Sequence, residues 1–166
     1  MAHSFEAMDA SDRQVVVHET PVWRDRADFI IAAQLGDADR PKRWEQLWAR
    51  QLGDAAFEVC CIPFFVYDLA LGDGVATQPA DERDYVVSRV VRSSGRSVFR
   101  VWLGESFQPR ERVVDELKGL GALVERSSLN LLAVDAADDV QAQAIADYLD
   151  VRERRSELLY ETGRTA

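Results

Sequence analysis

The stretch SVFRVWLGESFQPRERVVDELKGLGALVERSSLNLLAV, residues 97–134, decides the fold that we expect. Its first seven residues are rich in β-branched and aromatic side chains, which predicts a strand. Apolar residues at helical spacing follow over residues 109–120, behind a proline and ahead of a glycine, and they predict a helix. Residues 122–126 and 129–134 indicate two further strands. The stretch therefore predicts the order strand, helix, strand, strand.

The residues that follow continue this alternation. Asp138 opens a second predicted helix, and residues 158–160 predict a last strand. The order β-α-β-β-α-β over residues 97–162 is that of a ferredoxin-like fold, in which both helices cover one face of an antiparallel sheet. Four apolar side chains of the two helices should face that sheet: Val113, Leu117, Ile145 and Leu149.

Toward the N-terminus, residues 27–96 predict a small β-rich subdomain. Short β-prone runs between turn residues indicate its strands: 27–35, 57–61, 74–77 and 85–91. We expect the hairpin of residues 85–103 to join the sheet of this subdomain to the sheet of the C-terminal half.

One segment of the β-rich subdomain predicts a helix instead. Its apolar residues stand at i, i+3, i+4 and i+8, and Gly53 ends the run as a C-cap: Trp44, Leu47, Trp48 and Leu52. We expect this face to pack on the neighbouring strands. Residues 1–26 should form a partly disordered N-terminal extension, and residues 163–166 a tail. The predicted fold class is thus α+β.

Charge and composition exclude several classes of protein. The 166 residues carry 29 acidic and 20 basic side chains, a formal net charge of −9. Such a chain is poorly suited to neutralising phosphates, so nucleic acid is an unlikely partner. No apolar run approaches the roughly 18 residues of a membrane span, and two adjacent cysteines without a signal peptide favour the cytoplasm.

Metal and nucleophile chemistry find little support. The chain has two histidines, His3 and His18, and neither stands near a second metal-ligating residue at a suitable spacing. Cys60 and Cys61 are neighbours in a predicted strand, which disfavours a disulfide between them. We expect both thiols to be reduced and at least one of them to be buried. We expect no metal and no cofactor. Without a metal site or an activated nucleophile, the sequence favours a protein that is not an enzyme.

A small anionic ligand is the first candidate for a binding function. Arg89 and three further arginines follow the predicted hairpin, and Asp73 lies in a turn near an apolar segment, residues 62–65. The candidate ligand-binding residues are Phe64, Asp73, Arg92, Arg96 and Arg100. The alternative for the arginines is a solvated strand face that prevents edge-to-edge pairing.

A protein partner is the second candidate. Carboxylates gather on the two predicted helices of the C-terminal half: Asp115, Glu116, Asp138, Asp139 and Asp147. An acidic face of this kind can attract a basic protein by long-range charge. The alternative is an ordinary solvated helix face.

Several segments resemble the bacterial family DUF4265, over roughly residues 27–162. They are WEQLWARQLG from Trp44, FEVCCIPFFVYDLALGD from Phe57, SSGRSVFRV from Ser93 and LKGLGALVE from Leu117. The resemblance implies a small bacterial protein with an accessory role and no established activity. Members often carry histidine at the position of Arg96, so acid-base chemistry based on that histidine does not transfer to this chain.

From these observations we predict a cytoplasmic protein that acts by binding an unidentified, basic protein partner, as an immunity or antitoxin-like inhibitor does. The rival prediction is an enzyme or sensor that binds a small anionic ligand between residues 62–65 and the hairpin of Arg92 to Arg100.

Overall fold

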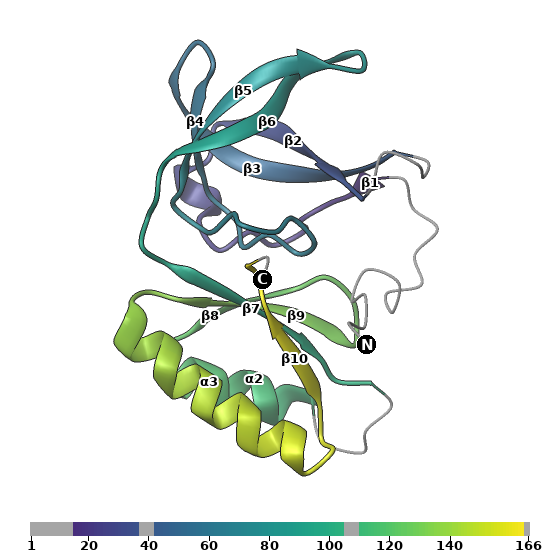
Figure 1. Cartoon of the computed structure of the whole chain (residues 1–166), viewed down its shortest axis with the longest axis vertical. Coiled ribbons are helices and arrows are strands. Elements are labelled where there is room, and N and C mark those ends of the chain that lie inside the picture. Colours follow the sequence, from purple (N-terminus) through teal and green to yellow (C-terminus); the bar gives the residue numbers. More distant parts are fainter. Residues whose placement is uncertain (1–14, 37–41, 105–109, 165–166) are drawn as a thin grey trace.

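The computed structural model describes residues 15–36, 42–104 and 110–164. In this part of the chain ten strands form two sheets, and two α-helices cover the second sheet (Figure 1). The expected disorder near the N-terminus, His3, and the expected helix start at Pro109 lie outside the described residues.

The first sheet closes into a five-stranded barrel. Its strands are β2 (Phe29–Leu35), β3 (Arg43–Gly53), β4 (Ala56–Val59), β5 (Gly74–Ala80) and β6 (Arg83–Arg92). Each pairs antiparallel with the next, and a parallel pairing of Ala32 with Val86 joins β6 back to β2. A sixth strand, β1 (Val15–Val16), pairs with β3. Closure leaves the barrel core fully enclosed around Leu47, Phe57 and Val75.

The second sheet has the order β10-β7-β9-β8, with all neighbours antiparallel. Its strands are β7 (Ser97–Trp102), β8 (Leu123–Arg126), β9 (Leu131–Ala136) and β10 (Leu159–Thr162). The helices α2 (Arg110–Gly119) and α3 (Asp139–Arg154) lie on the face away from the barrel (Figure 1). Asp138 caps α3 by accepting a hydrogen bond from the Gln141 N–H, 2.8 Å away. The helix residues expected to face the sheet are buried there: Val113, Leu117, Ile145 and Leu149.

The opposite face of this sheet is also buried, because the barrel side of the molecule packs against it. Val98, Leu131 and Ala133 share a core cluster with residues 62–71, the segment that connects β4 to β5. The short 3-10 helix η1 (Arg24–Arg26) lies beside the barrel near that segment (Figure 1). The second sheet is therefore covered on both faces, by the two helices on one and by residues 62–71, next to the barrel, on the other.

The fold class predicted from the sequence is wrong. The described chain is mostly β, with a closed barrel and only two helices, and does not consist of a small β-rich appendage followed by a ferredoxin-like half. The expected shared hairpin is also absent, because β6 belongs to the barrel and β7 to the second sheet. Pairing across the barrel joins residues 54 positions apart, Ala32 and Val86, and local sequence patterns do not encode such a contact.

The helix predicted around Trp44 is a strand, β3. Along β3 the buried residues Glu45, Leu47 and Ala49 alternate with more exposed ones, which is the period of a strand. The helical spacing of Trp44, Leu47 and Trp48 is coincidental, because β3 pairs with β2 on one side and β4 on the other. Neither described helix is long and apolar enough to cross a membrane.

Candidate functional site

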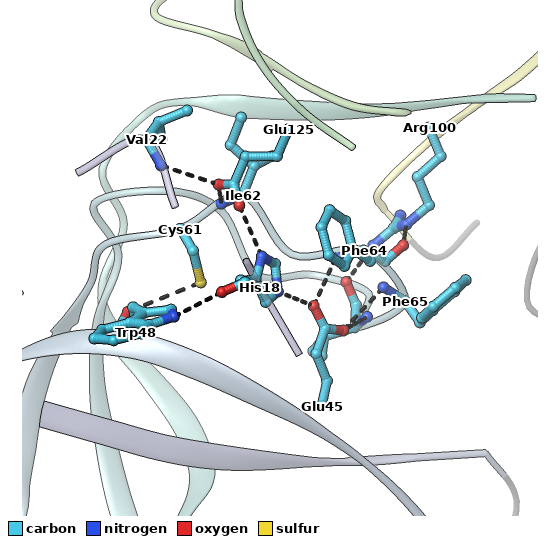
Figure 2. A network of polar contacts seen from close by, with 11 residues as sticks. His18, Val22, Glu45, Trp48, Cys61, Ile62, Phe64, Phe65, Arg100 and Glu125 are labelled. Carbon is cyan, nitrogen blue, oxygen red and sulfur yellow. Dashed lines mark hydrogen bonds and ion pairs between the residues drawn. The ribbon is translucent and has the colours of Figure 1, made fainter. Parts of the chain in front are cut away.

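A buried histidine stands where the barrel side meets the second sheet. The His18 ring lies between two carboxylates, with Nε2 2.7 Å from Glu45 Oε1 and Nδ1 2.8 Å from Glu125 Oε1 (Figure 2). Glu45 comes from β3 of the barrel and Glu125 from β8 of the second sheet. The ring also stacks on Phe64, with centroids 3.9 Å apart and planes 8° from parallel. His18 thus bridges the two halves of the molecule.

Both carboxylates also accept backbone hydrogen bonds. Glu45 accepts from the N–H groups of Phe64, Phe65 and Val66, at 2.7, 2.9 and 3.2 Å. Glu125 accepts from Ile62 N–H at 2.5 Å and more weakly from the Val22 N–H at 3.4 Å. The segment after β4 turns without regular structure, so these side chains satisfy its otherwise orphaned backbone donors.

The protonation state of His18 follows from its partners. Ionised carboxylates only accept hydrogen bonds, so contact with one at each ring nitrogen requires both nitrogens to carry hydrogen. Burial by itself lowers the pKa of His18, but the hydrogen bonds to Glu125 and Glu45 outweigh it, and the pKa is raised well above its usual value. Burial likewise opposes ionisation of Glu45, yet His18 and the backbone donors hold the pKa of Glu45 below its usual value. The cluster is an imidazolium between two carboxylates.

Arg100 completes the buried cluster from β7. Its side chain is fully buried, and its guanidinium donates to the backbone carbonyls of Phe64 and, at 2.5 Å, of Val66 (Figure 2). A third nitrogen, Nη1, has no hydrogen-bond partner among the residues that the structure describes. Burial lowers the pKa of Arg100. Arg100 therefore ties the second sheet to the segment that Glu45 holds on the barrel side.

The two cysteines are free and buried, as the sequence predicts. Burial and the nearby Glu58 carboxylate raise the pKa of Cys60 to about 11, and burial raises the pKa of Cys61. A thiol with a raised pKa is a poor nucleophile. His18 stands beside Cys61, but both of its ring nitrogens are engaged by carboxylates. The arrangement suits a structural cluster that holds the two halves together, and does not present a base to the thiol.

A second group of charged residues lies on the surface. Three arginines surround the carboxylate of Glu58 on β4: Arg26 at 2.7 Å, Arg50 at 3.4 Å and Arg92 at 3.6 Å. The arginine side chains are 43–63% exposed, whereas that of Glu58 is 8% exposed. We call these three residues the arginine cluster. Trp23 lies beside it, with Arg26 and Arg96 over its ring at 4.2 and 5.3 Å.

A pocket of about 220 Å³ opens next to this surface, between the end of β6 and residues 68–73. Apolar side chains of Leu69, Ala70, Val90 and Val98 contribute to its wall. The charged residues of its lining carry both signs: Asp68, Asp73, Arg96 and Arg164. The pocket is large enough for one side chain or a small ligand.

The structure separates the residues that were expected to bind a small anion. Asp73 and Arg96 line the pocket, but Asp73 accepts hydrogen bonds from the Ala70 and Ser94 N–H groups, and Arg96 pairs with Asp135. Arg92 belongs to the arginine cluster. Arg100 and Phe64 are buried in the interface between the two halves. The sequence did not reveal that both faces of the second sheet are covered.

The acidic residues expected to bind a partner lie on or beside the two helices. Asp115, Asp139 and Asp147 are exposed, and Asp147 accepts a hydrogen bond from Gln143. Asp138 is occupied as the N-cap of α3. Glu116 pairs with Arg112 and Arg152, each at 2.9 Å. Arginines of the protein itself therefore offset part of this acidic face.

Sequence reasoning missed the carboxylates of the buried cluster, Glu45 and Glu125. A signal for Glu45 was present, because a period of two places it on the same face as the buried residues Leu47 and Ala49. Nothing in the sequence around His18 indicated that it pairs with these two carboxylates. Within residues 15–36, 42–104 and 110–164, no group of three or more His, Cys, Asp and Glu side chains is placed to hold a metal ion.

Comparisons with known proteins agree with this geometry at the level of the fold. The model of a family described as a domain of unknown function, DUF4265, matches residues 45–160. The fold is similar to a solved structure from Neisseria gonorrhoeae, described as a novel crystal structure of a hypothetical protein. That similarity has a TM-score of 0.69 and 19% sequence identity, and it covers 81% of this chain and 93% of the other. No curated protein matches significantly.

Proposed function

Since this chain belongs to DUF4265, a family of domains of unknown function, we propose a role from its own surface: it is a non-enzymatic protein that binds an acidic segment of a partner protein. The arginine cluster is the recognition surface. This differs from the expectation of a basic partner. The three exposed arginines share a single carboxylate, whereas arginines of the protein itself offset part of the acidic face on the helices.

The shared carboxylate carries this proposal. Arg26, Arg50 and Arg92 have Glu58 as a common ion-pair partner, so the cluster keeps a local excess of positive charge on a chain whose net charge is −9. Arginine is well suited to a carboxylate because its planar guanidinium can donate two parallel hydrogen bonds. Carboxylates of a partner could form further ion pairs with these side chains.

The overall charge favours an acidic protein segment over nucleic acid. A long polyanion would gain at the arginine cluster but would be repelled by the net charge of −9 on the whole chain. A short acidic segment can contact the cluster alone. Its association should be faster at low salt, because exposed charges are screened over roughly 8–10 Å at moderate ionic strength.

Binding to a peptide of eight glutamates tests the proposal. The dissociation constant, measured by calorimetry at low and moderate salt, should rise by roughly 1.4- to 5-fold for each arginine replaced in Arg50→Gln and Arg92→Gln, since an exposed ion pair contributes about 0.2–1 kcal/mol. Arg112→Gln on α2 is the matched control, because Arg112 is 61% exposed and pairs within its own helix. Tighter binding of a single-stranded oligonucleotide than of the peptide would overturn the choice of a protein partner.

An immunity or antitoxin-like inhibitor of a basic effector is a second candidate. The exposed carboxylates Asp115, Asp139 and Asp147 favour it. In that case a peptide of eight lysines should bind, and replacing Asp139 and Asp147 by asparagine should weaken it. An unchanged affinity in that variant would leave the arginine cluster as the better candidate.

A further inference from the structure

One edge of β6 is open beyond the middle of the strand. On one side β6 pairs with β5 as far as Arg92, but its pairing with β2 on the other side is limited to Val86 and Ala32. Among the described residues, no strand covers that second edge from Ser88 to Arg92. An uncovered edge presents backbone N–H and C=O groups that can pair with another extended segment.

The same residues are exposed on both faces of the strand. All five from Ser88 to Arg92 are exposed, including the apolar Val90 at 37% and Val91 at 50%. A β-strand inside a barrel normally buries alternate residues. This segment therefore protrudes from the packed part of the barrel and has both an edge and apolar side chains available.

Two features beside the edge indicate what could occupy it. Arg89 and Arg92 lie on the segment itself, and Arg92 belongs to the arginine cluster. Val90 lines the 220 Å³ pocket, together with the apolar residues Leu69, Ala70 and Val98. An added strand would thus meet positive charge and, next to it, a recess with a partly apolar wall that fits one side chain.

We infer that the acidic partner segment binds by strand addition along the open edge of β6, with acidic side chains toward the arginine cluster and an apolar side chain in the pocket. This inference rests on the proposed function and specifies its mode. In strand addition, backbone hydrogen bonds supply affinity and pockets for alternate side chains supply specificity. A segment that alternates acidic and apolar residues matches this surface because successive side chains of a strand point to opposite sides.

A second copy of this chain is a poorer occupant. Pairing of the open edge with the same edge of another copy would bring Arg89 and Arg92 close to the same arginines of that copy. Like charges on paired strands are destabilising. The arginines therefore disfavour self-association through this edge while they attract an acidic segment.

The test uses a capped peptide of alternating glutamate and valine, eight residues long, and two derivatives of it. One derivative carries N-methyl groups on every glutamate and the other on every valine, so each blocks the backbone donors of one edge of the peptide. Strand addition predicts that one derivative binds at least about tenfold more weakly than the parent peptide and that the other binds within a few-fold. Amide hydrogen exchange of residues 88–92 should slow when the parent peptide binds.

Variants of the protein provide a matched pair. Val90→Thr retains β propensity but makes the pocket wall more polar, and it should weaken the parent peptide roughly threefold or more. Val140→Thr on α3, where Val140 is 82% exposed and does not line the pocket, should leave the affinity unchanged.

The outcomes separate the two proposals. If both methylated peptides bind as tightly as the parent and Arg92→Gln still weakens binding, strand addition is wrong and the proposed function stands. If the parent peptide and the peptide of eight glutamates both fail to bind at low salt, the proposed function itself is overturned. Slower exchange at the β1 edge of the barrel instead of at residues 88–92 would also contradict the inference.

Discussion

At the residue scale, His18 sets how stability should depend on pH. Its pKa is raised in the folded protein, so the stability that it contributes is complete below its unfolded pKa of about 6.5 and is lost as pH rises through the folded pKa. The pKa of Glu45 is lowered, so its contribution is present above its unfolded pKa of about 4.3 and is lost as pH falls through the folded value. We therefore expect the cluster to stabilise the fold most between about pH 4.3 and pH 6.5, the two unfolded pKa values.

Replacing His18 by glutamine tests this expectation. The free energy of unfolding, from urea titrations between about pH 6 and pH 9, should differ most between the two proteins at the acidic end of that range. The difference should shrink by about 1.4 kcal/mol for each pH unit, the effect of one linked proton. Loss of one partner from a buried ion pair costs roughly 3–5 kcal/mol. If His18→Gln does not fold, Glu125→Gln should shift the alkaline loss of stability to lower pH; a pH-independent difference would show that His18 is neutral.

At the element scale, β3 is the segment for which the sequence predicts a helix and the structure shows a strand. Two periods fit its residues, and the tryptophans satisfy the helical one. Glu45 distinguishes them, because a carboxylate on the apolar face of a strand needs buried partners, and here His18 and three backbone N–H groups supply them. The remaining strands except β1, which falls in the predicted N-terminal extension, were predicted close to their observed bounds, since their β-branched runs leave little ambiguity. The barrel closure and the His18 cluster were not, because they join residues distant in sequence.

Leucine substitutions within β3 distinguish the two interpretations by stability. A helix would place Leu47 and Leu52 on one packed face, whereas the strand buries Leu47 completely and leaves Leu52 49% exposed. Leu47→Ala should lower the free energy of unfolding by about 2–5 kcal/mol. Leu52→Ala, the matched control, should change it by no more than about 0.5 kcal/mol. Equal losses for the two variants would contradict the structure of β3.

At the scale of the whole molecule, the buried cluster and the core around Phe64 should make the two halves unfold together. Tryptophan fluorescence reports mainly on the barrel side, where Trp23, Trp44 and Trp48 lie, and far-UV circular dichroism reports on the helices of the other half. We expect the two signals to give one coincident urea transition.

Arg100 is the residue whose loss should separate those transitions. Arg100→Ala removes two hydrogen bonds from a charged donor to buried carbonyls, which should cost roughly 3 kcal/mol or more. The midpoints from fluorescence and circular dichroism should then differ. Arg112→Ala, on the exposed face of α2, should preserve one transition. Coincident midpoints in Arg100→Ala would show that apolar packing alone couples the halves.

The distance in sequence between His18 and Glu125 has a consequence for synthesis in the cell. The two residues are 107 positions apart, so at roughly 5–20 residues per second the ribosome needs about 5–20 s to add Glu125 after His18. A barrel that forms in that interval has no second sheet to cover the apolar side chains of residues 62–71. The nascent chain therefore exposes an apolar surface for seconds. We expect a chaperone to bind this surface, and aggregation should begin there if translation stalls before β8.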